Sequence, residues 1–122
     1  MSVNVSFVNP VSADLVAGRV VFVNSSEELA YSNGPLTGSV GVLFADADAG
    51  TEGAVITSGV TYVSSSGTIQ AGAYLVASAN GICVTGTGNA APWNVVGQAL
   101  ADSVGGLVLA NINPFRAASG SL

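Results

Sequence analysis

Apolar and polar residues alternate along much of this chain with a period of two, the spacing that places every second side chain on one face of a β-strand. At the N-terminus Val3, Val5 and Phe7 alternate with Asn4 and Ser6. Further along, short apolar runs rich in valine recur at 19–23, 39–45, 54–57, 60–63, 73–77, 82–85, 95–101 and 107–112. The pattern therefore predicts many short strands and no long helix.

Turn signals separate these runs, which favours antiparallel connections. They are Asn33-Gly34-Pro35, Ala49-Gly50, Ser58-Gly59, Ser66-Gly67, Asn80-Gly81, Gly86-Thr87-Gly88-Asn89 and Gly105-Gly106. The clearest tight hairpin is predicted at Asn80-Gly81. One turn of helix at most is expected, over residues 25–30. We predict an all-β chain, a compact antiparallel barrel or sandwich of about 8–10 short strands.

Two stretches of the chain resemble each other at an offset of about 55 residues. In each, an Ala-Gly pair precedes an apolar run, and a Val-Gly-x-x-x-Ala-Asp segment follows later. The stretches cover residues 15–57 and 69–113. We expect one β domain over residues 15–122, built from this internal repeat. Residues 1–14 lie outside both copies and are expected to form an extended N-terminal arm that is ordered only when something pairs with it.

Composition argues against catalysis. The chain has no histidine and no lysine, two arginines (Arg19 and Arg116) and one cysteine, so it lacks the usual general base and has few residues that could bind phosphate or zinc. We therefore predict that the protein is not an enzyme and holds no cofactor or metal. The net charge of −5 disfavours nucleic acid and anionic membranes. No apolar run approaches the roughly 20 residues that span a bilayer.

Charged residues are few, and none occurs from residue 53 to residue 101. A domain of this size cannot bury that whole stretch, so part of it must form a neutral, partly apolar surface. Such a surface favours association with identical subunits or with another protein.

Two further features have a simple structural interpretation beside a functional one. Asp46, Asp48 and Glu52 form the densest acidic cluster and could ligate calcium, but Gly50 occupies one ligand position, so a solvated turn is the simpler interpretation. Cys83 lies between Ile82 and Val84 and is expected to be a small buried side chain.

The order of these motifs resembles that of the small bacteriophage capsid decoration, or cement, proteins. The matching pieces span about residues 14–113: Ala17-Gly18, Val40-Gly41 with Ala45-Asp46, Ala49-Gly50, Gly59-Val60, Ala71-Gly72, Asn80-Gly81, and Val96-Gly97 with Ala101-Asp102. The chain departs from the family pattern at Arg19 and Ala73, where family members usually have an acidic residue. The resemblance implies a β-rich protein that binds the outer face of an assembled head, commonly as a homotrimer that clamps neighbouring major capsid proteins.

Two sets of residues are candidates for these contacts. Val3, Val5 and Phe7 on the arm could contact the capsid by adding a strand to a partner's sheet, or could form an ordinary first strand of the barrel. Trp93, Phe115 and Arg116 are candidates for the subunit interface, beside the uncharged surface of residues 53–101. Trp93 could equally fill the core, and Arg116 could lie in a surface tail.

The predicted function is thus that of a structural virion protein. It would be made in the host cytoplasm and act on the outer surface of the capsid, with the major capsid protein and itself as partners. The alternative is a tail, fibre or surface module that recognises glycans. That alternative needs exposed aromatic residues in a groove, whereas Tyr31, Tyr62, Tyr74 and Trp93 are scattered along the sequence.

Overall fold

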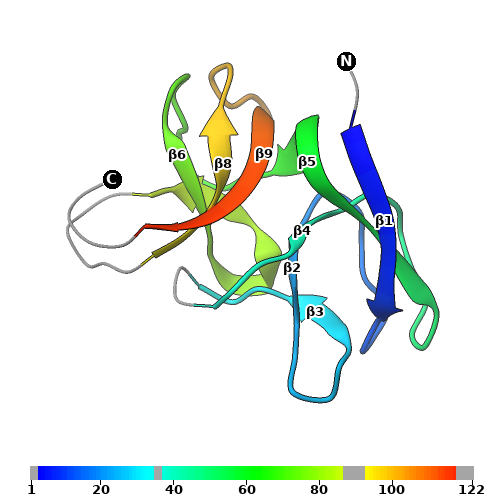
Figure 1. The fold of residues 1–122 in the computed structure, drawn as a ribbon. Coiled ribbons are helices and arrows are strands. Elements are labelled where there is room, and N and C mark those ends of the chain that lie inside the picture. Colours follow the sequence, from blue (N-terminus) through cyan, green and yellow to red (C-terminus); the bar gives the residue numbers. More distant parts are fainter. Residues whose placement is uncertain (1–2, 35–36, 87–92, 118–122) are drawn as a thin grey trace.

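The computed structural model describes residues 3–34, 37–86 and 93–117, and almost all of its regular structure is antiparallel β-sheet (Figure 1). The all-β prediction is confirmed. The described elements, in chain order, are β1 (Val3–Pro10), β2 (Val20–Val23), β3 (Leu29–Tyr31), β4 (Gly41–Leu43), β5 (Glu52–Ser64), β6 (Tyr74–Ala77), the short 3-10 turn η1 (Ala79–Gly81), β7 (Cys83–Thr85), β8 (Trp93–Ala99) and β9 (Leu107–Ala117).

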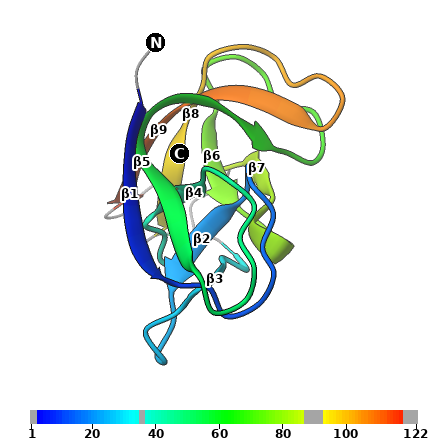
Figure 2. The same cartoon turned by 90° about the vertical axis from the view of Figure 1, so that its right-hand side faces the viewer.

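The strands follow one another across a single curled sheet in the order β3-β2-β4-β5-β9-β8-β6-β7. This order contains the same four-strand unit twice, β3-β2-β4-β5 and β7-β6-β8-β9. In each unit the strands that come second, first, third and fourth along the chain lie side by side in that order. Strand β1 is added to β5 outside this path, and Figure 2 shows the two strands running side by side. The two units join where β5 pairs with β9.

The two units also repeat each other in detail. Val21 pairs with Tyr31 in the first unit, and Leu75 pairs with Thr85 in the second. The backbone hydrogen bonds at the Ala-Gly turns correspond as well: Gly18 N to Leu43 O (2.8 Å), Gly72 N to Ala99 O (2.8 Å), Leu43 N to Arg19 O (2.9 Å) and Ala99 N to Ala73 O (2.8 Å). In each unit, the Ala-Gly turn is therefore hydrogen-bonded to the strand that ends shortly before the aspartate of the Val-Gly-x-x-x-Ala-Asp segment.

Those aspartates complete the turns. The amide of Ala17 donates to Asp46 Oδ1 at 2.8 Å, and the amide of Ala71 donates to Asp102 Oδ1 at 2.9 Å. A carboxylate is a strong acceptor for such a backbone N–H, which otherwise has only water as a partner. This bond gives a physical reason for an aspartate at the end of each Val-Gly segment.

We expect Asp46→Ala and Asp102→Ala each to lower the free energy of unfolding by about 1 kcal/mol, because both bonds are exposed and compete with water. Urea unfolding followed by tryptophan fluorescence would measure the change. Asp48→Ala is the matched control in the same loop, because no hydrogen bond of the Asp48 carboxylate is found among the described residues. An equal loss in all three variants would contradict the turn-closing role.

The core has two parts, and valine, leucine and isoleucine dominate both. The larger cluster joins the two units and includes Val42, Val63, Ile69, Leu75 and Ile112. The smaller cluster belongs to the first unit and includes Leu15, Leu29 and Leu43. Each of these side chains is at most 5% exposed. Neighbouring residues of β4 are buried in different clusters, Val42 in the larger and Leu43 in the smaller, so both faces of this strand are covered.

Two local expectations are wrong. The runs 54–57 and 60–63 are not separate strands, because Ser58-Gly59 forms no turn and both runs belong to β5. Gly59 has a φ of 121° and pairs with Val3 on one side and Ile112 on the other. A glycine allows this backbone conformation, so β5 bends there without ending.

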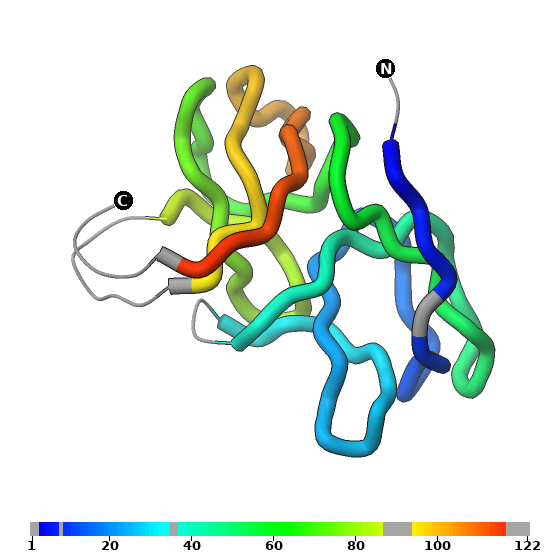
Figure 3. Tube along the Cα trace, in the orientation of Figure 1, coloured from blue at the N-terminus to red at the C-terminus, as the bar shows by residue number. Residues whose placement is uncertain are grey.

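The predicted helical turn over residues 25–30 is also absent. Asn24 and the residues after it form the tight connection between β2 and β3, at the lower end of the view in Figure 3. The side chain of Asn24 accepts hydrogen bonds from the amides of Ser26 (2.9 Å) and Glu28 (3.0 Å). An asparagine side chain that bonds nearby amides competes with helix formation and favours a turn. By contrast, the pairing of β6 with β7 confirms the hairpin predicted at Asn80-Gly81.

Candidate functional site

Strand β1 carries the three arm residues predicted to contact a partner. It pairs antiparallel with β5 of its own chain, with Val5 opposite Ile56 and Phe7 opposite Ala54. Its irregular register between Asn4 and Val5 gives the three side chains different surroundings. Val3 packs against the main core, whereas Phe7 is 73% exposed.

The outer edge of β1 is unpaired in the described part of the chain, since β5 is its one strand partner there. Asn4, Val5, Ser6 and Phe7 are all exposed, so both faces of the strand are open around that edge. An unpaired edge next to a large apolar side chain is a typical site for β-strand addition. The arm is therefore part of the sheet, and its free edge can still accept another strand.

A second apolar surface lies where β5 meets the start of β9. Tyr62 on β5 is exposed, and so are Leu107 on β9 and Val104 in the preceding turn. Tyr62 pairs with Leu109, and Ser64 pairs with Leu107, which places these side chains along one face of the two strands. Exposed apolar side chains gathered in this way are typical of surfaces that contact another protein.

The predicted subunit-interface residues lie together at the paired ends of β8 and β9. Trp93 pairs with Ala117, Asn94 with Arg116, and Val95 with Phe115. Arg116 is exposed and makes no ion pair among the described residues. The backbone of Trp93 begins β8, but its side chain lies outside the described part of the structure.

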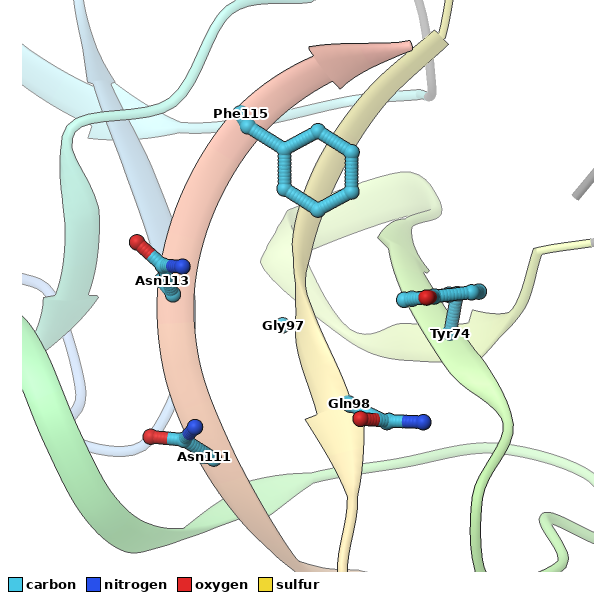
Figure 4. Close-up of a pocket in the computed structure, with 6 residues that line it drawn as sticks. All are labelled: Tyr74, Gly97, Gln98, Asn111, Asn113 and Phe115. Atoms are coloured by element: carbon cyan, nitrogen blue, oxygen red, sulfur yellow. The ribbon is translucent and has the colours of Figure 1, made fainter.

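Phe115 belongs to a groove of about 220 Å³ on the outer face of β6, β8 and β9. Its ring packs edge-on against Tyr74, with the ring centres 6.2 Å apart and an interplanar angle of 84°. The other lining residues are Gly97, Gln98, Asn111 and Asn113. Figure 4 shows five side chains arranged around the bare backbone at Gly97. A second hollow is lined by Thr68, Gln70, Ala73 and Thr85.

The acidic cluster at residues 46–52 forms hydrogen bonds to the backbone. Asp46 binds the Ala17 amide, and the backbone oxygen of Asp48 accepts from Thr51 Oγ1 at 2.7 Å. Across the described ranges, no three acidic, histidine or cysteine side chains are grouped so that they could hold a metal ion. Nor does the described part contain a helix long and apolar enough to cross a membrane.

Cys83 is fully buried in the main core, as expected of a small apolar side chain. Burial raises the pKa of its thiol from 9.0 to about 12. Between these two values the unfolded chain loses the thiol proton while the folded chain keeps it, so the stability of the fold decreases as the pH rises through that range.

We expect the Cys83 thiol to resist an aromatic disulfide reagent at mildly alkaline pH in the folded protein. Labelling should become at least about a thousandfold faster in unfolding concentrations of urea, because the thiol then becomes accessible and ionises normally. Absorbance of the released thiolate measures the rate. Equal labelling rates with and without urea would contradict the burial of Cys83.

Comparisons with known proteins add two findings. Residues 2–111 match the family described as phage cement protein. The fold is similar to the crystal structure of the head fiber gp8.5 N base in bacteriophage phi29, with a TM-score of 0.66 and 19% sequence identity over 92% of this chain and 95% of that one. A comparison with curated proteins gives no match.

Proposed function

Because the chain belongs to the phage cement protein family, we propose that it binds the outer surface of an assembled phage capsid and stabilises the shell by bridging neighbouring major capsid proteins. The observation that carries this proposal is the family match, which extends over residues 2–111. The protein is a structural component of the virion. Its net charge of −5 suits an outer surface better than contact with packaged DNA.

The free edge of β1 supplies the capsid contact. Phe7 is the natural anchor, because a largely exposed aromatic side chain gains most when a partner covers it. A strand of the capsid protein that pairs with β1 would add backbone hydrogen bonds, which fix the orientation of the bound protein.

Stabilisation follows from mass action. A protein that binds the assembled shell, but not its separated subunits, shifts the assembly equilibrium by its binding free energy. Three linked copies would strengthen this effect, since the second and third contacts form at a high effective concentration. We assign the contact between copies to the part of the uncharged stretch 53–101 around exposed Tyr62, beside Val104 and Leu107.

The test is to mix the purified protein with undecorated heads and image the particles by electron cryomicroscopy. The expected result is added density at symmetry axes of the shell, together with increased resistance of the decorated heads to heat. Intact heads that carry no added density would contradict the proposal. Sedimentation of the free protein tests the homotrimer separately, because a trimer has three times the mass of the chain.

A further inference from the structure

We propose that the groove of Tyr74, Gln98, Asn111, Asn113 and Phe115 on β6, β8 and β9 binds an uncharged carbohydrate. This function is additional to capsid binding and does not depend on it. It assigns Phe115 to a ligand site instead of the subunit contact that the sequence suggests.

The register of the strands builds the groove. Tyr74 pairs with Gln98, and Gln98 pairs with Asn111, so three side chains form a row across β6, β8 and β9. Asn113 and Phe115 follow Asn111 along β9 and line the same groove, across the irregular register between Val95 and Gly97 of β8. Figure 4 shows Asn111, Asn113 and Phe115 spaced along β9, with Gln98 on β8 and Tyr74 on β6.

Gly97 gives the groove its open floor. A Cβ atom at this position would clash with the backbone oxygen of Asn111, so β8 and β9 approach too closely for any side chain to fit. Gly97 therefore lines the groove without adding a side chain to it. A concave site with a few convergent polar groups is typical of small-molecule binding.

The lining residues have the chemistry that recognises sugars. Planar amides both donate and accept hydrogen bonds, as sugar hydroxyl groups do, and aromatic side chains pack against the apolar C–H faces of a sugar ring. Within the described residues, the side-chain amides of Asn111 and Asn113 have no hydrogen-bond partner. Gln98 Nε2 donates to the backbone oxygen of Gly72 at 2.9 Å, which fixes the orientation of its amide. No charged residue lines the groove, so an ionic ligand is not favoured.

The first four-strand unit shows that the fold does not require these polar residues. There the corresponding row is Val20, Val42 and Ile56, which pair with one another in the same way across β2, β4 and β5. All three are buried in the main core. The second unit presents the same row to solvent and fills it with an aromatic residue and two amides, which is a specialised surface for a ligand.

The groove and the docking strand are well separated. Figure 1 shows β1 at one side of the molecule and β6 and β8 at the other. A protein held on a shell through β1 would therefore present the groove away from that contact. Capsid binding and carbohydrate binding can then occur together.

The experiment screens the full chain on an array of neutral and N-acetylated oligosaccharides. It then titrates chitotetraose, cellotetraose, maltotetraose and the best array ligand while following the side-chain amide signals by nuclear magnetic resonance. We expect signals of Gln98, Asn111 and Asn113 to shift on saturation. Phe115→Ser and Asn111→Ala should each weaken binding about tenfold, the effect of losing one good contact. Phe44→Ser is the matched control, because Phe44 is 52% exposed and Phe115 is 45% exposed, but Phe44 lies outside the groove.

Three outcomes would overturn the proposal. These are the absence of any ligand that shifts these signals, an equal loss of binding in Phe44→Ser and Phe115→Ser, and a shift of the same signals with protein concentration alone. The last outcome would identify the groove as a contact between copies of the chain. None of these results bears on decoration of heads, so the two functions can fail independently.

Discussion

Replacing Gly97 by alanine is expected to lower the free energy of unfolding by about 3 kcal/mol or more. The new Cβ atom would lie against the backbone oxygen of Asn111 and within 3.1 Å of Ile112 Cα, and neither can move without separating β8 from β9. Overpacking against backbone is among the most destabilising of single changes. Urea unfolding of Gly97→Ala beside the native protein measures the loss.

Two glycines serve as comparisons. Gly41 occupies the corresponding place in the first unit, where a Cβ atom would clash with the backbone oxygen of Ile56, so Gly41→Ala should cost at least as much. Its φ of +153° adds backbone strain for any residue with a side chain. Gly38 has open space around it, and Gly38→Ala should change stability by no more than about 0.5 kcal/mol. A Gly97→Ala protein as stable as Gly38→Ala would show that β8 and β9 pair differently.

Replacing Phe7 by serine is expected to weaken binding to undecorated heads at least about 30-fold, the effect of losing a central aromatic anchor. The side chain is too exposed to contribute much to folding, so the variant should keep its native unfolding midpoint. Occupancy is measured by co-sedimentation of labelled protein with heads over a range of concentrations. In a trimer the loss would be larger, because each copy loses the same anchor.

Phe115→Ser is the matched control, because Phe115 is an exposed phenylalanine on β9, a strand that does not pair with β1. It should bind heads as tightly as the native protein. If Phe7→Ser also decorates heads at native affinity, the contact does not involve the outer edge of β1. A preserved unfolding midpoint is needed in both variants for this comparison to be valid.

The sequence predicted the strands well where a short apolar run is buried in the core. Buried Val42 and Val76 lie in strands that their apolar runs predict. The prediction from the sequence failed where a local pattern is compatible with two different structures. Gly59 resembles a turn glycine but permits a bend within β5, and Leu29 follows a polar turn that resembles a helix start but begins β3. In both places the pairing of distant strands decides the local structure.

The candidate sites were less predictable because they depend on register. Tyr74 and Phe115 are far apart in the chain and meet because β8 lies between their strands. The bond from Ala17 to Asp46 joins two motifs that the sequence shows in order but not in contact. The one signal that points to the groove is the comparison of the two units, since Val42 and Gln98 occupy equivalent places with opposite polarity.

The pairing of β1 with β5 has a mechanical consequence. The two strands run antiparallel from the pair Val3–Gly59 to the pair Pro10–Glu52. A pull directed along β1 loads all the hydrogen bonds of this ladder at once, whereas a pull across the sheet would open them one after another. Since β5 also pairs with β4 and β9, such a force spreads into both halves of the molecule. A subunit attached to an expanding shell through β1 would thus be loaded in shear, the direction in which a β-sheet best resists an applied force.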